Sequence, residues 1–180
     1  MIIGITGTLG AGKTTIVEYL KRNGFSHYSV RDFLIEEIKR RDMPINRDSM
    51  VTVANDLRQK HSPSYIVEQI YEQAKGKDAV IESIRTPGEV KALKEHGDFM
   101  LLAIDAEMKT RYDRIIARQS ETDQISFEKF KADEEREMQS DEEHKQNIAK
   151  CIDLSDHRID NNGSIEDFYN KVEVILDEKR

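Results

Sequence analysis

Residues 7–14, with the sequence Gly-Thr-Leu-Gly-Ala-Gly-Lys-Thr, have types and spacing suited to binding phosphate groups. They fit the pattern G-x-x-x-x-G-K-[ST] at every specified position. Glycines let such a loop curl with its N–H groups pointing inward, and the positive end of the following helix attracts anions. We therefore predict a polyphosphate site in which Lys13 reaches the β- and γ-phosphates and Thr14 binds Mg²⁺. The predicted nucleotide-binding residues of this loop are Gly7, Gly10, Ala11, Gly12, Lys13, Thr14 and Thr15.

The residues on either side of the loop are those that the pattern requires. An apolar run at residues 1–5 predicts a buried strand that enters the loop, and Ile16, Val17 and Leu20 form an apolar stripe at helical spacing after it. A plain glycine-rich turn between a strand and a helix is the alternative interpretation. The match at all four specified positions favours the phosphate site.

Length and composition limit the class of protein. The 180 residues, 37% of them hydrophobic, suffice for one α/β domain over residues 1–180. Cys151 is the single cysteine, so no intramolecular disulfide is possible. The sequence has no apolar run near the roughly 20 residues that span a bilayer and no pattern of a signal peptide, so we expect a cytoplasmic protein without a membrane partner. A net charge of −7 argues against general nucleic-acid binding. Composition leaves the oligomeric state open.

Predicted strands and helices alternate along the chain. Further strands are expected at residues 25–30, 79–83, 99–104 and 157–160, from their aromatic, β-branched or continuous apolar character. The pattern predicts a three-layer α/β/α sandwich with a central, mostly parallel five-stranded sheet. Between the strands we expect helices that begin at Asp32, at Asp48, at Ser62-Pro63, at the capping box of Thr86 and Glu89, near Met108, and at Ser164.

Side chains that follow each predicted strand should converge on the bound ligand, because ligands of open α/β sheets bind at the carboxyl ends of the strands. Asp32 can accept a proton from an attacking hydroxyl, and Glu82 can lie near Mg²⁺. Arg31 and Arg85 can neutralise substrate phosphates. The residues in these positions are Arg31, Asp32, Glu82, Ser83, Arg85, Asp105, and 161–163.

An acidic stretch precedes the last predicted strand. Residues 121–143 contain ten acidic and three basic residues with few apolar ones, so we expect this stretch to pack poorly. We predict that residues from about 119 to 145 form a lid that closes over the nucleotide and the acceptor and excludes water. The predicted acceptor-binding helical segment covers about residues 32–76.

Beyond the loop, residues 29–34, 84–89 and 159–164 resemble segments of the P-loop nucleoside-monophosphate kinases. The chain is most similar to dephospho-coenzyme A kinase and to the archaeal adenylate-kinase-related proteins. The resemblance implies that Asp32 occupies the acidic position of the family and that Arg85 grips the phosphate of the acceptor. It further implies lid roles for Arg114, Arg118 and Arg136, and adenine contacts for Asn161 and Gly163.

The sequence departs from the family pattern at the acceptor side. Arg31 stands where nucleotide kinases often have a small residue, and Glu82-Ser83 replaces a common Asp-Gly. The acceptor is therefore open between dephospho-coenzyme A, a nucleoside monophosphate and a deoxynucleotide.

These observations predict an ATP-dependent kinase that uses Mg²⁺ and acts on a nucleotide-like small molecule. The expected catalytic residues are Lys13, Asp32, Arg85, Arg114 and Arg118; the expected substrate-binding residues are Arg31, Arg58 and Arg85; and the expected metal ligands are Thr14 and Glu82. The alternative is a P-loop switch or regulatory ATPase that has no small-molecule acceptor. Arginines gathered in an acidic chain favour the kinase.

Overall fold

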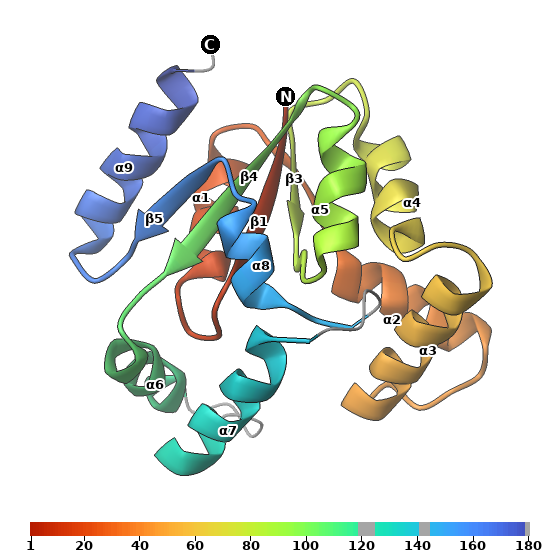
Figure 1. Ribbon diagram of the computed structural model, residues 1–180. Coiled ribbons are helices and arrows are strands. Elements are labelled where there is room, and N and C mark those ends of the chain that lie inside the picture. Colours follow the sequence, from red (N-terminus) through yellow and green to blue (C-terminus); the bar gives the residue numbers. More distant parts are fainter. Residues whose placement is uncertain (119–124, 141–144, 179–180) are drawn as a thin grey trace.

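The computed structural model describes residues 1–118, 125–140 and 145–178, apart from the side chain of Arg47. Its central sheet has five parallel strands in the order β2-β3-β1-β4-β5, which confirms the predicted architecture (Figure 1). The strands are β1 (Ile2–Gly7), β2 (Ser26–Ser29), β3 (Ala79–Glu82), β4 (Phe99–Asp105) and β5 (His157–Asp160).

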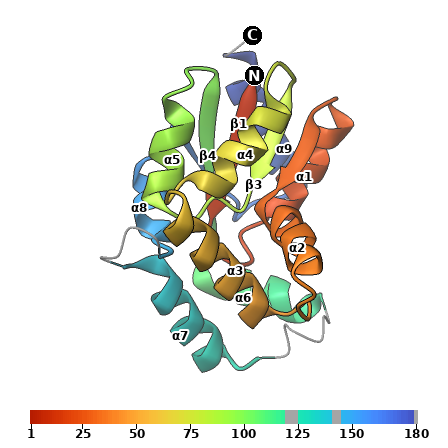
Figure 2. The ribbon, with the colours of Figure 1, turned by 90° about the vertical axis from the view of Figure 1, so that its right-hand side faces the viewer.

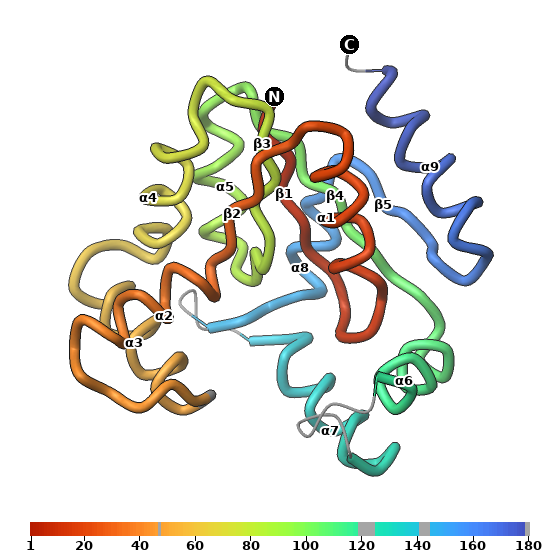
Figure 3. Tube along the Cα trace, turned by 180° about the vertical axis from the view of Figure 1, so that it is seen from behind, coloured from red at the N-terminus to blue at the C-terminus, as the bar shows by residue number. Residues whose placement is uncertain are grey.

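Helices cover both faces of this sheet. Alternate side chains of a buried strand point to opposite faces, so apolar side chains on both faces have to be covered. Ile3 and Ile5 of β1 pack in one core with α1 (Lys13–Arg22) and α9 (Ile165–Asp177), which lie on the side shown in Figure 3. Ile2 belongs to a second core on the opposite face. Helices that contribute to this second core are α2 (Val30–Arg40), α3 (Arg47–Lys60), α4 (Tyr65–Ala74), α5 (Pro87–Lys94) and α8 (Ile148–Asp153).

Two helices lie beyond the carboxyl ends of the central strands. They are α6 (Met108–Ala117) and α7 (Phe127–Met138), at the bottom of Figure 1 and Figure 2. This is the end of the sheet at which β1 leads into the glycine-rich loop, so both helices are close to the predicted phosphate site. None of the described helices is long and apolar enough to span a membrane.

Several helix starts differ from the predicted ones by a few residues. The N-cap of α2 is Ser29, whose hydroxyl accepts a hydrogen bond from the backbone N–H of Asp32, so the prediction that Asp32 caps this helix was wrong. Likewise Asn46 caps α3 in place of Asp48, because its carboxamide oxygen already accepts from the N–H of Ser49. Helix α4 has Ser64 at its N-cap, after the predicted Ser62-Pro63. The predicted capping box of α5 is confirmed.

The described part of the acidic stretch, residues 125–140, is better packed than its composition predicted. Phe130 of α7 is completely buried, and its ring lies near that of Tyr112 in α6. Helix α8 was not predicted, and its Ile148 and Cys151 are buried. The predicted lid falls partly outside the described residues, at 119–124 and 141–144, so only α7 and its neighbouring residues can be placed.

Candidate functional site

The glycines of residues 7–14 have conformations and surroundings that exclude side chains. Gly7 has a φ of 132°, and a Cβ atom there would lie 1.9 Å from the carbonyl oxygen of Ile104. Gly12 has a φ of 107°, and its Cβ would lie 2.3 Å from Nδ2 of Asn161. The loop therefore curls tightly between β1 and α1 against the end of β4, as a phosphate-binding loop requires.

Lys13 folds back over the loop that precedes it. Its Nζ donates hydrogen bonds to the carbonyl oxygens of Gly7 at 2.8 Å and Thr8 at 2.6 Å. Burial, followed by the positive charges of Arg85 and Arg111, lowers the pKa of Lys13 to about 7, although nearby carboxylates oppose the change. An anion at this position would restore the charged form of Lys13, since opposite charges favour ionisation.

Glu82 lies at the carboxyl end of β3 with about a quarter of its side chain exposed. Its Oε1 is 3.4 Å from Nε2 of His27, and the neighbouring His27 lowers the pKa of Glu82 despite burial. The carboxylate is therefore ionised near neutral pH. Ser83 follows with a φ of 68°, a left-handed conformation that suits the glycine expected from the family pattern.

The oxygen atoms of Thr14 and Glu82 fit Mg²⁺ chemically, since this ion prefers carboxylate and hydroxyl oxygens. Thr14 is exposed in the first turn of α1. Within the described ranges there is no group of three or more His, Cys, Asp or Glu side chains that could enclose a metal ion. Mg²⁺ held here would thus take its remaining ligands from phosphates and water, as is common for this ion.

The predicted substrate arginines have different surroundings. Nη1 of Arg85 lies 3.2 Å from Oε2 of Glu137 and 3.1 Å from Oε1 of Gln146. Arg58 instead forms a buried ion pair with Glu89, at 2.7 Å. Arg31 is exposed in the first turn of α2, next to Asp32, which is also exposed. Both Arg85 and Arg58 therefore have partners within the protein. Of these two, only Arg85 is close enough to Lys13 for its charge to lower the pKa of that residue.

Asn161 links the loop to α6. Its side-chain Nδ2 donates to the backbone carbonyl oxygen of Ala11 at 2.8 Å. The backbone carbonyl oxygen of Asn161 accepts from Nη2 of Arg114, also at 2.8 Å. Arg118 is exposed after the end of α6, and Gly163 is exposed just before α9. The structure brings Arg114 and Asn161 to the loop, while the proposed roles of Arg118 and Gly163 stay predictions.

Arg111 is a site residue that sequence reasoning missed, because it lies buried on the same face of α6 as Ile115. It is 4% exposed and donates from Nε to the carbonyl oxygen of Ala106 at 2.7 Å and from Nη1 to that of Leu9 at 3.3 Å. Its guanidinium also pairs with both carboxylate oxygens of Glu134. Arg111 therefore lies against the phosphate loop. The sequence did contain one indication of this position. Arg111 follows soon after β4, and β4 is the parallel neighbour of β1, which leads into the phosphate loop.

The sequence matches the model of an AAA domain over residues 3–145. It is also 30% identical over 180 residues to a UPF0200 protein of Methanococcus maripaludis strain C7, covering 97% of this chain and 95% of the relative. The chain belongs to the UPF0200 family. A second member, from Methanocaldococcus jannaschii, is 31% identical over 99% of this chain and 90% of its own length.

Solved structures with the same fold include kinases. A crystal structure of TT1252 from Thermus thermophilus has a TM-score of 0.66 at 19% identity and covers 99% of this chain and 97% of its own. Shikimate kinase from Aquifex aeolicus has a TM-score of 0.60 at 14% identity, with 99% and 98% of the two chains covered. These similarities show that this UPF0200 protein has a P-loop kinase-like fold.

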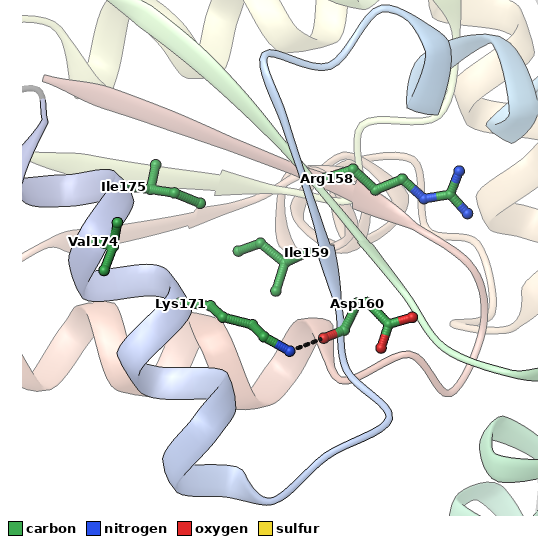
Figure 4. A pocket seen from close by; sticks show the side chains of 6 residues that line it. All are labelled: Arg158, Ile159, Asp160, Lys171, Val174 and Ile175. Carbon is green, nitrogen blue, oxygen red and sulfur yellow. Dashed lines mark hydrogen bonds between the residues drawn. The ribbon is translucent and has the colours of Figure 1, made fainter.

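A separate pocket of about 380 Å³ lies between β5 and α9 (Figure 4). Lys171 crosses it and donates to the carbonyl oxygen of Asp160 at 3.0 Å. No residue of the phosphate loop lines this pocket, so it is not part of the candidate site. The residues that line it are Arg158, Ile159, Asp160, Lys171, Val174 and Ile175.

Proposed function

We propose that this protein is an ATP-dependent kinase that transfers the γ-phosphoryl group to a nucleotide-like small molecule. The observation that carries the proposal is that Arg85 and Glu82 lie close enough to Lys13 for their charges to affect its pKa. Glu82 is the last residue of β3 and Arg85 follows it, while Lys13 stands at the end of the loop that follows the neighbouring strand β1. A cation, a carboxylate and a phosphate loop at one place are the parts that phosphoryl transfer uses.

Each residue then has a defined role. Lys13 and the loop N–H groups would hold the β- and γ-phosphates of ATP, and Thr14 with Glu82 would hold Mg²⁺, which neutralises charge on those phosphates. Arg85 would bind the phosphate of the acceptor. Asp32 would orient the attacking hydroxyl and accept its proton.

The remaining predicted residues surround these groups. Arg114 and Arg118 would stabilise the transferred phosphoryl group, Asn161 and Gly163 would contact the adenine, and Arg31 would bind the acceptor. Arg58 would act indirectly, because its partner Glu89 also accepts a hydrogen bond from the backbone N–H of Arg85. The sequence resemblance of residues 29–34, 84–89 and 159–164 to nucleotide and dephospho-coenzyme A kinases suggests dephospho-coenzyme A and nucleoside monophosphates as the first acceptors to test.

The decisive experiment measures ATP consumption by the purified protein with Mg²⁺, alone and with dephospho-coenzyme A, nucleoside monophosphates or deoxynucleoside monophosphates. We expect one acceptor to raise the rate at least about a hundredfold over hydrolysis, because positioning is the main source of catalysis in phosphoryl transfer. The Lys13→Ala variant should stay folded and lose this activity. If none of the acceptors raises the rate while ATP still binds, a nucleotide-dependent switch explains the site better.

We further propose that α7 belongs to a lid over residues 119–145 that closes when ATP and acceptor are both bound. Exclusion of water would prevent wasteful hydrolysis of ATP. Amide hydrogen exchange of α7 should slow when a bisubstrate analogue binds. Equal exchange rates with and without the analogue would show that α7 is a fixed part of the scaffold.

A further inference from the structure

Arg111 is a buried cation beside the phosphate loop. Its side chain is 5% exposed, and its backbone carbonyl oxygen lies 2.6 Å from the position of a Cβ atom on Gly10, so α6 is in close contact with the loop. Its positive charge contributes to the lowered pKa of Lys13, as does that of Arg85. Two guanidinium groups and the amine of Lys13 thus lie around one loop. The two permanent positive charges of Arg85 and Arg111 are unfavourable together unless negative charge lies among them.

Helix α7 supplies that negative charge from one face. Glu134 and Glu137 are three residues apart and therefore project from the same side of the helix. Glu134 pairs with Arg111 through both carboxylate oxygens, and Glu137 pairs with Arg85 at 3.2 Å. Glu134 is 11% exposed and Glu137 is 21% exposed, so both carboxylates lie largely inside the site.

The geometry of the Glu134 pair is that of an anion bound by a guanidinium. Arg111 uses Nε to bind the carbonyl oxygen of Ala106, which fixes the orientation of the side chain, and its two Nη atoms bind the carboxylate. Carboxylate and phosphate oxygens present similar acceptors to this fork of donors. A phosphate could therefore replace the carboxylate without any change in the position of Arg111.

We propose that Arg111 and Arg85 form a phosphate-binding pair of the candidate site, and that Glu134 and Glu137 occupy this pair in place of phosphates in the free protein. This inference rests on the proposed function, because it adds residues and a ligand class to the same site. A bound polyphosphate brings several negative charges to the loop, so it competes with both carboxylates for the arginines and repels them. Glu134 and Glu137 are then internal competitors of the ligand.

The test is calorimetric titration of inorganic tripolyphosphate into the full chain and into variants that remove one carboxylate charge. Glu134→Gln and Glu137→Gln should each bind tripolyphosphate about fivefold or more tightly than the wild type, because the arginines no longer have to give up a carboxylate. Glu135→Gln is the matched control: it removes the same charge from α7, but Glu135 is 67% exposed and lies 3.9 Å from Lys131 of its own helix. Its affinity should stay within about twofold of the wild type.

A second variant identifies the arginine that the carboxylate releases. Arg111→Lys keeps the charge but loses the two-pronged contact, so it should weaken tripolyphosphate binding, and Glu134→Gln should give little gain when added to it. Thermal unfolding of each variant establishes that it is folded. If Glu134→Gln and Glu137→Gln bind with unchanged or lower affinity, the carboxylates are structural partners and the proposal is overturned.

The result of the tripolyphosphate titration does not depend on whether the protein is a kinase. Tripolyphosphate binding requires neither an acceptor nor turnover, so a gain in affinity for both carboxylate variants would support the phosphate-binding pair even if no acceptor stimulates ATP consumption. Conversely, a kinase whose carboxylate variants bind no more tightly than the wild type would keep its proposed function and lose this inference. Absence of tripolyphosphate binding in the wild type and in both variants would also overturn it.

Discussion

Oε1 of Glu89 lies 2.7 Å from Nη2 of Arg58, and the side chains of this ion pair are 1% and 9% exposed. The other carboxylate oxygen of Glu89 accepts hydrogen bonds from the backbone N–H groups of Arg85 at 3.0 Å and Thr86 at 3.1 Å. Glu89 therefore connects α3 to the turn that carries Arg85. The ion pair between Arg58 and Glu89 therefore lies outside the candidate site but helps to fix the position of Arg85 within it.

Loss of one partner of this pair should destabilise the protein. We expect Arg58→Met to lower the free energy of unfolding by about 3 kcal/mol, since it leaves the buried carboxylate of Glu89 without its counter-ion. Urea unfolding measures this change. Lys60→Met is the control, because Lys60 pairs with Asp56 at the surface with 64% of its side chain exposed, and a pair of this kind contributes about 0–1 kcal/mol. Equal stability of the two variants would show that Arg58 has no structural role.

The environment of Lys13 predicts a dependence of stability on pH. Its pKa is about 7 in the folded protein and 10.5 in the unfolded chain, so the unfolded chain binds one more proton between these values. Stability therefore rises with pH across this interval and is reduced below pH 7. Relative to Lys13→Met, we expect the wild type to gain about 4 kcal/mol between pH 6.5 and pH 10.

Urea unfolding of both proteins at several pH values checks this expectation. The comparison with Lys13→Met cancels the titration of the other groups, which the two proteins share. A constant difference between them over the whole interval would mean that Lys13 keeps an ordinary pKa in the folded protein.

Regular patterns in the sequence predicted the fold correctly, whereas single side-chain partners were harder to predict. The five strands follow from local aromatic, β-branched or continuous apolar character, and the phosphate loop follows from its glycines. Arg111 was missed because its burial depends on Glu134, which lies 23 residues further along the chain. The caps of α2 and α3 were misplaced because Ser29 and Asn46 were equally able to bind the first free N–H groups, and sequence alone does not fix which residue does so.

Cys151 should be unreactive in the folded protein. It is completely buried in α8, and burial, with the negative charge of Glu89, raises the pKa of its thiol to about 12. Only the thiolate is strongly nucleophilic, so alkylation by iodoacetamide at pH 8 should be negligible without denaturant and complete in urea. Mass spectrometry of the intact chain measures the modified fraction. Rapid modification under native conditions would contradict the placement of α8.

Comparison of Gly12→Ala with Gly24→Ala should distinguish an effect on nucleotide binding from a general effect of backbone strain. Gly12→Ala places a Cβ atom 2.3 Å from Nδ2 of Asn161, which is held by its hydrogen bond to Ala11, so the loop has to move. Gly24→Ala is a matched control, because Gly24 also has a positive φ, of 90°, but a Cβ there meets no atom within 4 Å. Both variants should lose about 1 kcal/mol of stability from the left-handed conformation.

The two variants should differ in ATP affinity. We expect Gly12→Ala to weaken binding more than about tenfold, since displacement of the loop misaligns the N–H groups that hold the phosphates. Gly24→Ala should bind ATP as the wild type does, because Gly24 follows the C-cap of α1, at the opposite end of this helix from the loop. Fluorescence titration with a labelled ATP analogue measures both affinities. If Gly12→Ala binds as tightly as Gly24→Ala, the phosphates are held elsewhere, and residues 7–14 are only a tight turn between β1 and α1.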